Sequence, residues 1–345
     1  MSRGPTVTVA GAGALGLSAA LALADAGCVV TVFDPAPPLA NASGVAAGML
    51  APVFEAVLDE VARPDLDLLM AARDLWPGLE ARAGVRLDRA GAVAVGAPRW
   101  LGEVQAQIVR LGLHATELPR ATLDEVAAGL SPVFDRALWT REDWRLEAET
   151  ALAALRAACA AAGVAFRDEP ARGAMGAERL VVATGAAQDL TELAPELAAL
   201  TPIKGHIARL AGAPPPAMTV RGEGVYVTAG AAGVVVGATM EAGVADPAPD
   251  PAQAEPLLAR GVKLFPDLKG RPHQLGAGVR AATPDGLPLV GFSRAPGVVL
   301  AVGARRNGWL LAPLVGRIVA ACVTEREPGP YAARLAPGRF AGEAS

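Results

Sequence analysis

A pair of cations directly precedes an apolar run near the C-terminal end of the chain. Arg305 and Arg306 stand before Asn307, and the run that begins at Trp309 reads as the start of a helix. The first amides of a helix have no partner within it and carry partial positive charge, which favours anions. We therefore expect one of the two arginines to point inward at an anion beside this helix N-terminus. A solvated helix start is the alternative.

A second group of residues suited to ligand binding lies near the N-terminus, in the turn GAGALG. This turn follows a buried strand over 6–10 and precedes apolar residues at helical spacing. Gly11 permits a tight turn, Gly13 lets the backbone approach a pyrophosphate, and Gly16 lets the helix pack closely on the strand. Asp34 ends the next strand, where a carboxylate can bond a ribose hydroxyl. The pattern predicts a dinucleotide site without deciding between FAD and NAD; a turn that serves packing alone is the alternative.

Two later stretches favour a flavin. RLVVATGA, residues 179–186, reads as a buried strand that ends in Thr-Gly. RAATPDGLPLVG, residues 280–291, reads as a turn around Pro284-Asp285-Gly286 followed by a short apolar strand. Other elements are plain: an amphipathic helix at 147–162, and a hairpin whose strands flank Ala231-Ala232.

Composition excludes several classes of protein. The chain has 345 residues, of which 52% are hydrophobic and 19% charged, so it is globular rather than disordered. Its net charge of -4, with no basic run, argues against a nucleic-acid partner. The three cysteines are widely spaced, which predicts neither a metal site nor a disulfide framework and suggests a reducing cytoplasm. Glycines and Asp25 interrupt the apolar stretch at 7–33, so we expect no membrane span.

The order of the motifs resembles that of the FAD-dependent D-amino-acid oxidase superfamily. The glycine-rich turn with Asp34 is followed by ASGVAAGMLAP, VVATG, TPDGLPLVG and RNGWLLAP, between Val7 and about Ala320. Within that superfamily, AAGML, VVVGATM and RNGWLLAP together resemble the glycine oxidases of thiamine biosynthesis. The resemblance implies non-covalent FAD, since no cysteine lies near RAATPDG.

The resemblance also implies an α/β fold, α+β overall. A Rossmann-like FAD-binding domain of the glutathione-reductase type would be discontinuous, and a substrate-binding domain would be built on an antiparallel sheet. The expected FAD-binding segments are 1–85, 145–210 and 277–345, and the expected substrate-binding segments are 86–144 and 211–276.

For the substrate site, the resemblance implies a carboxylate clamp. Arg280 would be the principal carboxylate ligand, because a guanidinium holds a carboxylate with two hydrogen bonds. Arg306 would be a second cation for the carboxylate or would act on the environment of the amine, with Arg305 solvated and turned away. Tyr226 would bond the carboxylate, with core packing as the alternative. Three further residues would belong to the pocket: Met49 and Met240 as apolar walls, and Glu55 on a lid loop, unless it is a solvated acid.

For the cofactor, the resemblance extends the glycine-rich turn to other parts of the chain. The small residues of NASGVAAG would let backbone amides approach the flavin ring, and Val164 would meet the adenine. The expected cofactor-binding residues are Gly11, Gly13, Ala14, Gly16, Asp34, Ser43, Ala47, Gly48, Met49, Val164, Thr184, Gly185, Arg280, Asn307 and Gly308. Asn307 has helix capping as its alternative role.

Two departures from the family pattern affect specificity. Histidines of the family are replaced here: Ala304-Arg305 stands at the position before the RNG motif, and Gly224 stands two residues before Tyr226. Both changes can enlarge the pocket or alter its polarity. His206 is expected to be structural.

The expected reaction is oxidation of glycine or another small amino acid, such as sarcosine, D-alanine or D-proline. Hydride would pass from the α-carbon to flavin N5, with molecular oxygen as acceptor, giving an imine or 2-oxo acid, ammonia and hydrogen peroxide. The alternatives are a flavin dehydrogenase that reduces a quinone or protein carrier, an NAD-dependent reductase, and a flavin protein without turnover. A homo-oligomer is compatible with the resemblance, which also includes a role in thiazole synthesis.

Overall fold

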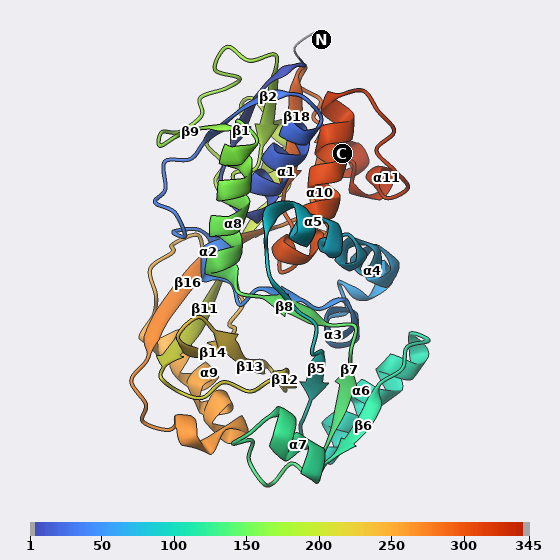
Figure 1. Ribbon diagram of the computed structural model, residues 1–345, viewed down its shortest axis with the longest axis vertical. Coiled ribbons are helices and arrows are strands. Elements are labelled where there is room, and N and C mark those ends of the chain that lie inside the picture. The colour runs from blue at the N-terminus through green and yellow to red at the C-terminus, as the bar shows by residue number, and fades with distance from the viewer. Residues whose placement is uncertain (1–3, 341–345) are drawn as a thin grey trace.

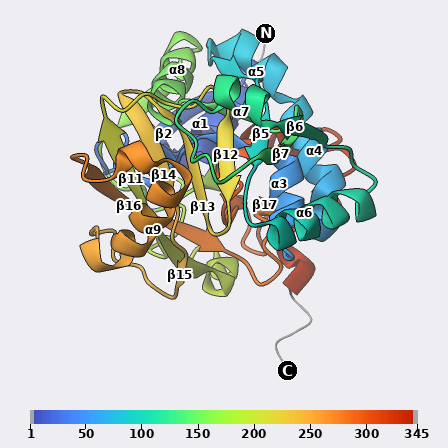
Figure 2. The ribbon, with the colours of Figure 1, turned by 90° about the horizontal axis from the view of Figure 1, so that it is seen from below.

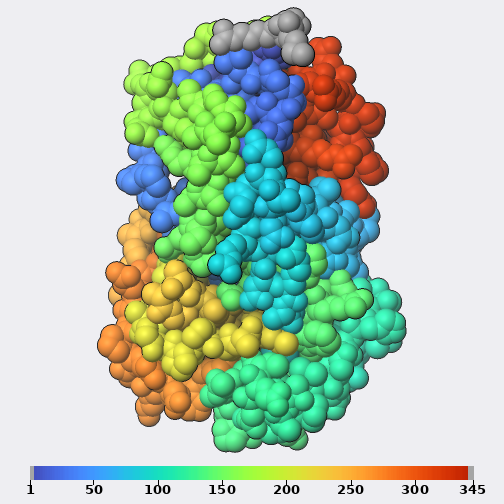
Figure 3. All heavy atoms as spheres, viewed as in Figure 1, coloured from blue at the N-terminus to red at the C-terminus, as the bar shows by residue number. Residues whose placement is uncertain are grey.

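The computed structural model describes residues 4–340. It is built on two sheets, one at each end of the long axis (Figure 1). Helix α5 (Trp76–Ala83) and its neighbours lie on one face between these two ends (Figure 3). The first strand of the chain and its last long helix both lie in the upper half (Figure 1).

The first sheet has six strands in the order β17-β18-β10-β1-β2-β9. Every neighbouring pair is parallel except β17 and β18. Parallel sheets are buried on both faces, and the strands are accordingly rich in Val and Ala. The predicted Rossmann-like arrangement is confirmed. The strands are β1 (Thr6–Ala10), β2 (Val29–Phe33), β9 (Ala165–Arg167), β10 (Arg179–Val182), β17 (Leu289–Phe292) and β18 (Val298–Val302).

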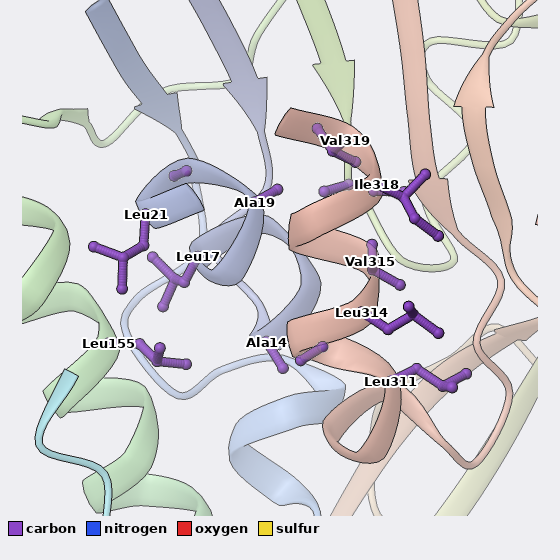
Figure 4. Packing of buried hydrophobic residues seen from close by; sticks show 14 of the residues in the cluster. Ala14, Leu17, Ala19, Leu21, Leu155, Leu311, Leu314, Val315, Ile318 and Val319 are labelled. Carbon is purple, nitrogen blue, oxygen red and sulfur yellow. The ribbon is translucent and has the colours of Figure 1, made fainter. Parts of the chain in front are cut away.

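Three helices pack side by side near this sheet: α1 (Ala14–Asp25), α8 (Ala148–Ala161) and α10 (Gly308–Val323). Helix α1 turns small side chains toward α10 (Figure 4). A Cβ on Gly316 would lie 2.7 Å from the Ser18 carbonyl oxygen, so the two helix backbones approach closely. This contact fixes the N-terminus of α10 beside the glycine-rich turn.

The second sheet has nine strands and carries α9 (Pro251–Leu264) on its lower face (Figure 2). Its pairs are antiparallel except that β5 and β12 run parallel, an exception to the expected antiparallel sheet. The predicted hairpin is confirmed, since β13 and β14 meet at the pair Gly230 and Gly233. The strands are β5 (Ala92–Ala94), β6 (Thr116–Pro119), β7 (Arg136–Thr140), β11 (Thr201–Ala211), β12 (Thr219–Gly222), β13 (Val225–Gly230), β14 (Gly233–Gly237), β15 (Glu241–Ala242) and β16 (Gln274–Ala282).

Short elements connect the two sheets. A three-stranded sheet joins β3 (Met49–Leu50), β4 (Leu87–Asp88) and β8 (Trp144–Leu146). The other helices are α2 (Ala42–Val45), α3 (Pro52–Leu58), α4 (Leu66–Asp74), α6 (Pro98–Arg110), α7 (Arg120–Val126) and α11 (Ala332–Leu335). Short 3-10 helices cover Arg63–Asp65, Pro195–Ala199, Pro266–Leu268 and Pro337–Phe340. Within residues 4–340, none of the helices combines the length and apolarity that a membrane crossing requires.

Candidate active site

The glycine-rich turn closes tightly over the end of β1. Gly11 has φ +108°, a conformation that side chains rarely adopt, and a Cβ there would lie 2.3 Å from the Ala183 carbonyl oxygen. A Cβ on Gly16 would lie 2.0 Å from the Gly11 oxygen. A Cβ on Gly13, by contrast, would approach only the Ser43 hydroxyl, at 3.2 Å. The first and third glycines thus serve packing, and the second leaves the open face at which a ligand can lie.

Asp34 lies beside this turn at the carboxyl end of β2. Its carboxylate accepts hydrogen bonds from the amides of Ala12, at 2.7 Å, and Ala36, at 2.9 Å. Asp34 therefore holds the conformation of the turn. It also lies where the pattern predicts a ribose hydroxyl. That second role stays a prediction.

The small-residue loop is held against both helix N-termini. The Ser43 hydroxyl accepts a hydrogen bond from the Ala14 amide at 3.0 Å, and the Ser43 carbonyl accepts one from the Trp309 indole at 3.1 Å. Gly48 has φ +74°, and a Cβ there would lie 2.2 Å from the Leu146 oxygen. Ala47, Gly48 and Met49 consequently form a close-packed wall of the cavity described below.

The remaining cofactor residues divide into two groups. Thr184 and Gly185 follow β10 at the same sheet edge as the glycine-rich turn, and Asn307 and Gly308 begin α10. The Asn307 side chain does not cap that helix, which leaves it free at the cavity. Val164 is different: it is buried and precedes β9, which runs parallel to β2. It therefore lies at the amino ends of the strands, away from the nucleotide end, and its expected adenine contact is not supported.

These placements fit FAD. Within residues 4–340, neither α1 nor α10 has a side-chain hydrogen bond from its N-cap residue. The Ala14 amide of α1 donates to the Ser43 hydroxyl, and the other amides in the first turns of the two helices can face an anion. A Cβ on Gly308 would meet no atom within 4 Å, as expected of a backbone that faces a ligand space. Asp34 supplies the acidic end of the nucleotide pattern.

A cavity of about 320 Å³ lies between the small-residue loop and the second sheet. Its charged lining comes from four distant parts of the chain: Glu55 from α3, Arg221 from β12, Arg280 from β16, and Arg306 from the segment before α10. The sheet edge of the first domain and the strands of the second thus meet here. Of the residues expected at the substrate, Arg280, Arg306, Tyr226, Met49, Met240 and Glu55 all line this cavity.

The guanidinium of Arg280 is buried at the cavity wall and can bind an anion. Its side chain crosses over β11 at Gly205, where a Cβ would lie 2.1 Å from Arg280 Nη1. That nitrogen is buried and has no hydrogen-bond partner among the described residues. Burial lowers the pKa of Arg280, because a charged group is removed from water, and the nearby Arg306 lowers it further. A bound carboxylate would relieve both effects.

Arg305 and Arg306 are both ion-paired. Arg306 donates to Glu55 at 3.1 Å and to Asp59 at 3.3 Å, and the acid Glu55 is the main cause of its raised pKa. Arg305 also pairs with Asp59, and its side chain is only 15% exposed. The expectation of a solvated Arg305 is therefore wrong, because Asp59 follows α3 and faces the start of α10. Arg305 does turn away from the cavity lining.

Glu55 is neither on a lid loop nor solvated. It lies within α3 and is 4% exposed. Its Oε1 meets Arg306, while Oε2 is buried without a partner among residues 4–340. Pro52 can begin α3, and the carboxylate of Asp143 accepts the amides of Val53 and Phe54 at 2.8 and 3.0 Å. The helix thereby directs an acid into the cavity.

Tyr226 stands on β13 with its ring over β14. It is 8% exposed, and a Cβ on Gly237 would lie 2.1 Å from its hydroxyl oxygen. Burial raises the pKa of Tyr226, while Arg280 and Arg221 lower it less strongly. Met240 lines the cavity but is 41% exposed, which places it toward the rim.

The two departures from the family pattern lie in different environments. Gly224 has φ +66° and lines the cavity without a side chain, and a Cβ there would lie 3.5 Å from Arg260 Nη1. Ala304 is buried and bridges to Ala282, away from the cavity lining. His206 is fully buried and bonded to Glu241 and to the Asp250 amide, which agrees with its expected structural role.

Sequence reasoning missed several residues of this site. Arg221 lines the cavity at 3% exposure, directly opposite Tyr226 in the β12–β13 hairpin. The Glu223-Gly224 turn between two apolar segments was a signal that could have found it. Asp59 and Asp143 carried no such signal, because their partners are distant in sequence. Burial raises the pKa of Asp143 to about 6, although Arg221 and the amides of α3 oppose the shift.

Similarity to known proteins extends over nearly the whole chain. The chain is 33% identical to a putative thiamine biosynthesis oxidoreductase ThiO of Rhizobium etli, covering 93% of this chain and 97% of that protein. It is 30% identical to the bifunctional protein ThiO/ThiG of Trichormus variabilis, covering 98% of this chain. The match spans about half the length of that bifunctional relative, 56%.

The fold has a similar counterpart among solved structures. Glycine oxidase from Geobacillus kaustophilus superposes with a TM-score of 0.82 at 25% identity, over 98% of this chain and 99% of that one. The family described as FAD dependent oxidoreductase matches residues 6–322, which include the glycine-rich turn and all the charged residues of the cavity. The chain therefore belongs to the FAD-dependent oxidoreductase family.

Proposed function

We propose that the chain is an FAD-dependent oxidase of glycine or another small amino acid, such as sarcosine, D-alanine or D-proline. The observation that carries the proposal is the unpaired, buried Nη1 of Arg280 at the wall of a small cavity beside the cofactor loop. Relatives whose names are glycine oxidase and ThiO support the class of substrate.

Arg280 would hold the substrate carboxylate. A guanidinium in a buried site binds a carboxylate with strong, oriented hydrogen bonds, which fixes the position of the α-carbon. Tyr226 lines the same cavity, where its hydroxyl could donate a hydrogen bond to the same carboxylate. Gly205 leaves the space through which Arg280 reaches the cavity.

Arg306 and Glu55 would set the charge around the amine. Arg306 is neutralised by Glu55 and Asp59, so it does not compete with Arg280 for the carboxylate as a free cation would. The unpartnered Oε2 of Glu55 can accept a hydrogen bond from the substrate amine. Hydride leaves only when the amine is neutral, and the ion pair of Glu55 with Arg306 weakens the tendency of this acid to keep the amine protonated.

Bound FAD, held by the glycine-rich turn and the small-residue loop, would supply the two-electron acceptor for the α-carbon hydride, with molecular oxygen as the final acceptor and hydrogen peroxide as its product. The amino acid loses one hydride and one proton to become an imine, which water hydrolyses to a 2-oxo acid and ammonia. The apolar walls at Ala46, Ala47 and Met49 restrict water around the transferring hydride. The ThiO names of relatives suggest that the imine serves thiamine thiazole synthesis.

The proposal is tested by steady-state turnover of the flavin-loaded protein in air. Glycine, sarcosine, D-alanine and D-proline are compared by oxygen uptake and peroxide release. One peroxide per substrate oxidised supports the oxidase. Flavin reduction without peroxide, relieved by an added quinone, would show a dehydrogenase instead, and absence of any turnover would contradict the proposal.

A further inference from the structure

One charged side chain of the cavity has no part in the chemistry proposed above. Arg221 lines the cavity from β12 and is 3% exposed. Its Nε and Nη2 are buried without a hydrogen-bond partner, and no hydrogen bond within residues 4–340 uses its side chain. A buried donor without a partner is unfavourable, and more so when it is charged. A guanidinium in this state is suited to a ligand that supplies acceptors.

The acids near Arg221 are shared with other groups, although Oε2 of Glu55 has no hydrogen-bond partner among residues 4–340. Glu55 Oε1 lies 3.5 Å from Arg221 Nη2 but 3.1 Å from Arg306, to which it is hydrogen-bonded. Asp59 is shared by Arg305 and Arg306. Both oxygens of Asp143 accept amides of α3. The two acids of the α3 region therefore balance the two arginines before α10, and Arg221 and Arg280 are left as the cations with spare donors.

The two cations lie on different strands around one aromatic ring. Arg221 stands opposite Tyr226 in the hairpin, with its guanidinium carbon 5.8 Å from the ring centroid. Arg280 comes from β16 and lines the same cavity as this tyrosine. A ligand that fills the cavity beside Tyr226 can thus meet a guanidinium from two directions. Gly224, which also lines the cavity, follows Arg221 in the hairpin turn.

We propose that Arg221 forms a second carboxylate subsite, so that the preferred substrates are small amino acids with a second carboxylate, such as D-aspartate. This inference rests on the proposed function, in which Arg280 binds the α-carboxylate. The planar fork of Arg221 would bind the second carboxylate with paired hydrogen bonds. Glycine and D-alanine occupy only the Arg280 side of the cavity.

Binding of non-oxidisable acids tests the subsite without turnover. Calorimetric titration of the flavin-loaded protein compares succinate with butyrate, which has the same chain length and one carboxylate. We expect succinate to bind at least tenfold more tightly. Arg221→Met should weaken succinate binding at least tenfold more than butyrate binding, and Arg221→Lys, which keeps the charge without the fork, should fall between. Arg260→Met is the control, because Arg260 is exposed and lies near Gly224 but outside the cavity lining.

Substrate preference provides a second test of the Arg221 subsite. The wild-type protein should oxidise D-aspartate with a kcat/KM at least tenfold above that for D-asparagine, and Arg221→Met should remove this difference. Equal binding of succinate and butyrate by the wild-type protein, or preference for D-asparagine, would overturn the subsite even if no Arg221 variant folds. Butyrate binding that depends on Arg280 would then still support the proposed function. If neither acid binds and no amino acid is oxidised, the proposed function itself fails.

Discussion

The nucleotide end of the first sheet and the cavity beside the second sheet are built by opposite means. The nucleotide end is made of backbone, and it depends on side chains that are absent, as at Gly11 and Gly16. The cavity is made of charged side chains, drawn from α3, β12, β16 and the segment before α10. This difference teaches that cofactor binding and substrate choice can change separately. A change in the first region should remove the cofactor, and a change in the second should alter the substrate.

The largest effect is expected in the cavity. Arg280→Met removes the guanidinium that would hold the substrate carboxylate, and kcat/KM should fall about a thousandfold, or about 4 kcal/mol. The bound flavin should be retained, because the side chain does not support the glycine-rich turn. Steady-state kinetics with flavin content measured in parallel checks this. Arg260→Met is the matched control; equal losses in both variants would refute the clamp.

The nucleotide end should respond in stability and in flavin content. Gly11→Ala forces a Cβ to within 2.3 Å of the Ala183 oxygen at φ +108°, and we expect a loss of about 3 kcal/mol together with bound flavin. Gly27→Ala is the control, since Gly27 also has positive φ but open space around it, and should cost about 1 kcal/mol. Chemical denaturation and flavin absorbance measure both quantities. If the Gly11 variant retained flavin, the claim that the nucleotide end controls cofactor binding would be contradicted.

The same contrast explains what the sequence could predict. Gly11, Gly16 and Asp34 belong to one strand–helix–strand unit of about 30 residues, so local spacing was enough to place them. The cavity depends on contacts between distant residues, such as Asp143 with Val53 and Asp59 with Arg305. No local pattern records these contacts, and for that reason Arg305 was expected in solvent and Glu55 on a loop.

Strand direction accounts for the other difference. Val164 was placed by its motif, but the register of β9 against β2 puts it at the amino ends of the strands. The family resemblance identified Arg280, Arg306 and Tyr226 as cavity residues, whereas their charge partners required the structure. Arg221 could have been placed from the hairpin alone, because the register sets it opposite Tyr226.

A pH-dependent effect of intermediate size is expected at Asp143. Its pKa in the folded protein is about 6, above the ordinary value near 3.9, so the folded state binds this proton more tightly than the unfolded state does. The stabilisation is complete below about pH 4 and is lost as pH rises to about 6. Relative to Asp143→Asn, the wild-type protein should lose about 2 to 3 kcal/mol over this range. The free energy of unfolding of both proteins is measured from pH 4 to 7. If it changes with pH by the same amount in the two proteins, the raised pKa of Asp143 is contradicted.

The smallest effect concerns the acid of α3. Glu55→Gln removes one counter-charge of Arg306 but keeps the shape, and Asp59 still pairs with that arginine. We expect a loss of about 1 to 2 kcal/mol in unfolding free energy. Glu60→Gln is the control, because the Glu60 side chain is 89% exposed and its contact with Arg63 is 3.9 Å long. Equal stability of the two variants would mean that the buried pair does not hold the cavity together.

The central claim is that Arg280 positions an amino acid beside the flavin. Its most direct test is anaerobic mixing of the flavin-loaded protein with each candidate amino acid while the visible flavin absorption is followed. The account predicts that at least one small amino acid bleaches the flavin, that air restores it with release of peroxide, and that Arg280→Met binds flavin yet is bleached at least a hundredfold more slowly. Bleaching at the same rate in the Arg280 variant, or none in the wild-type protein, would contradict it.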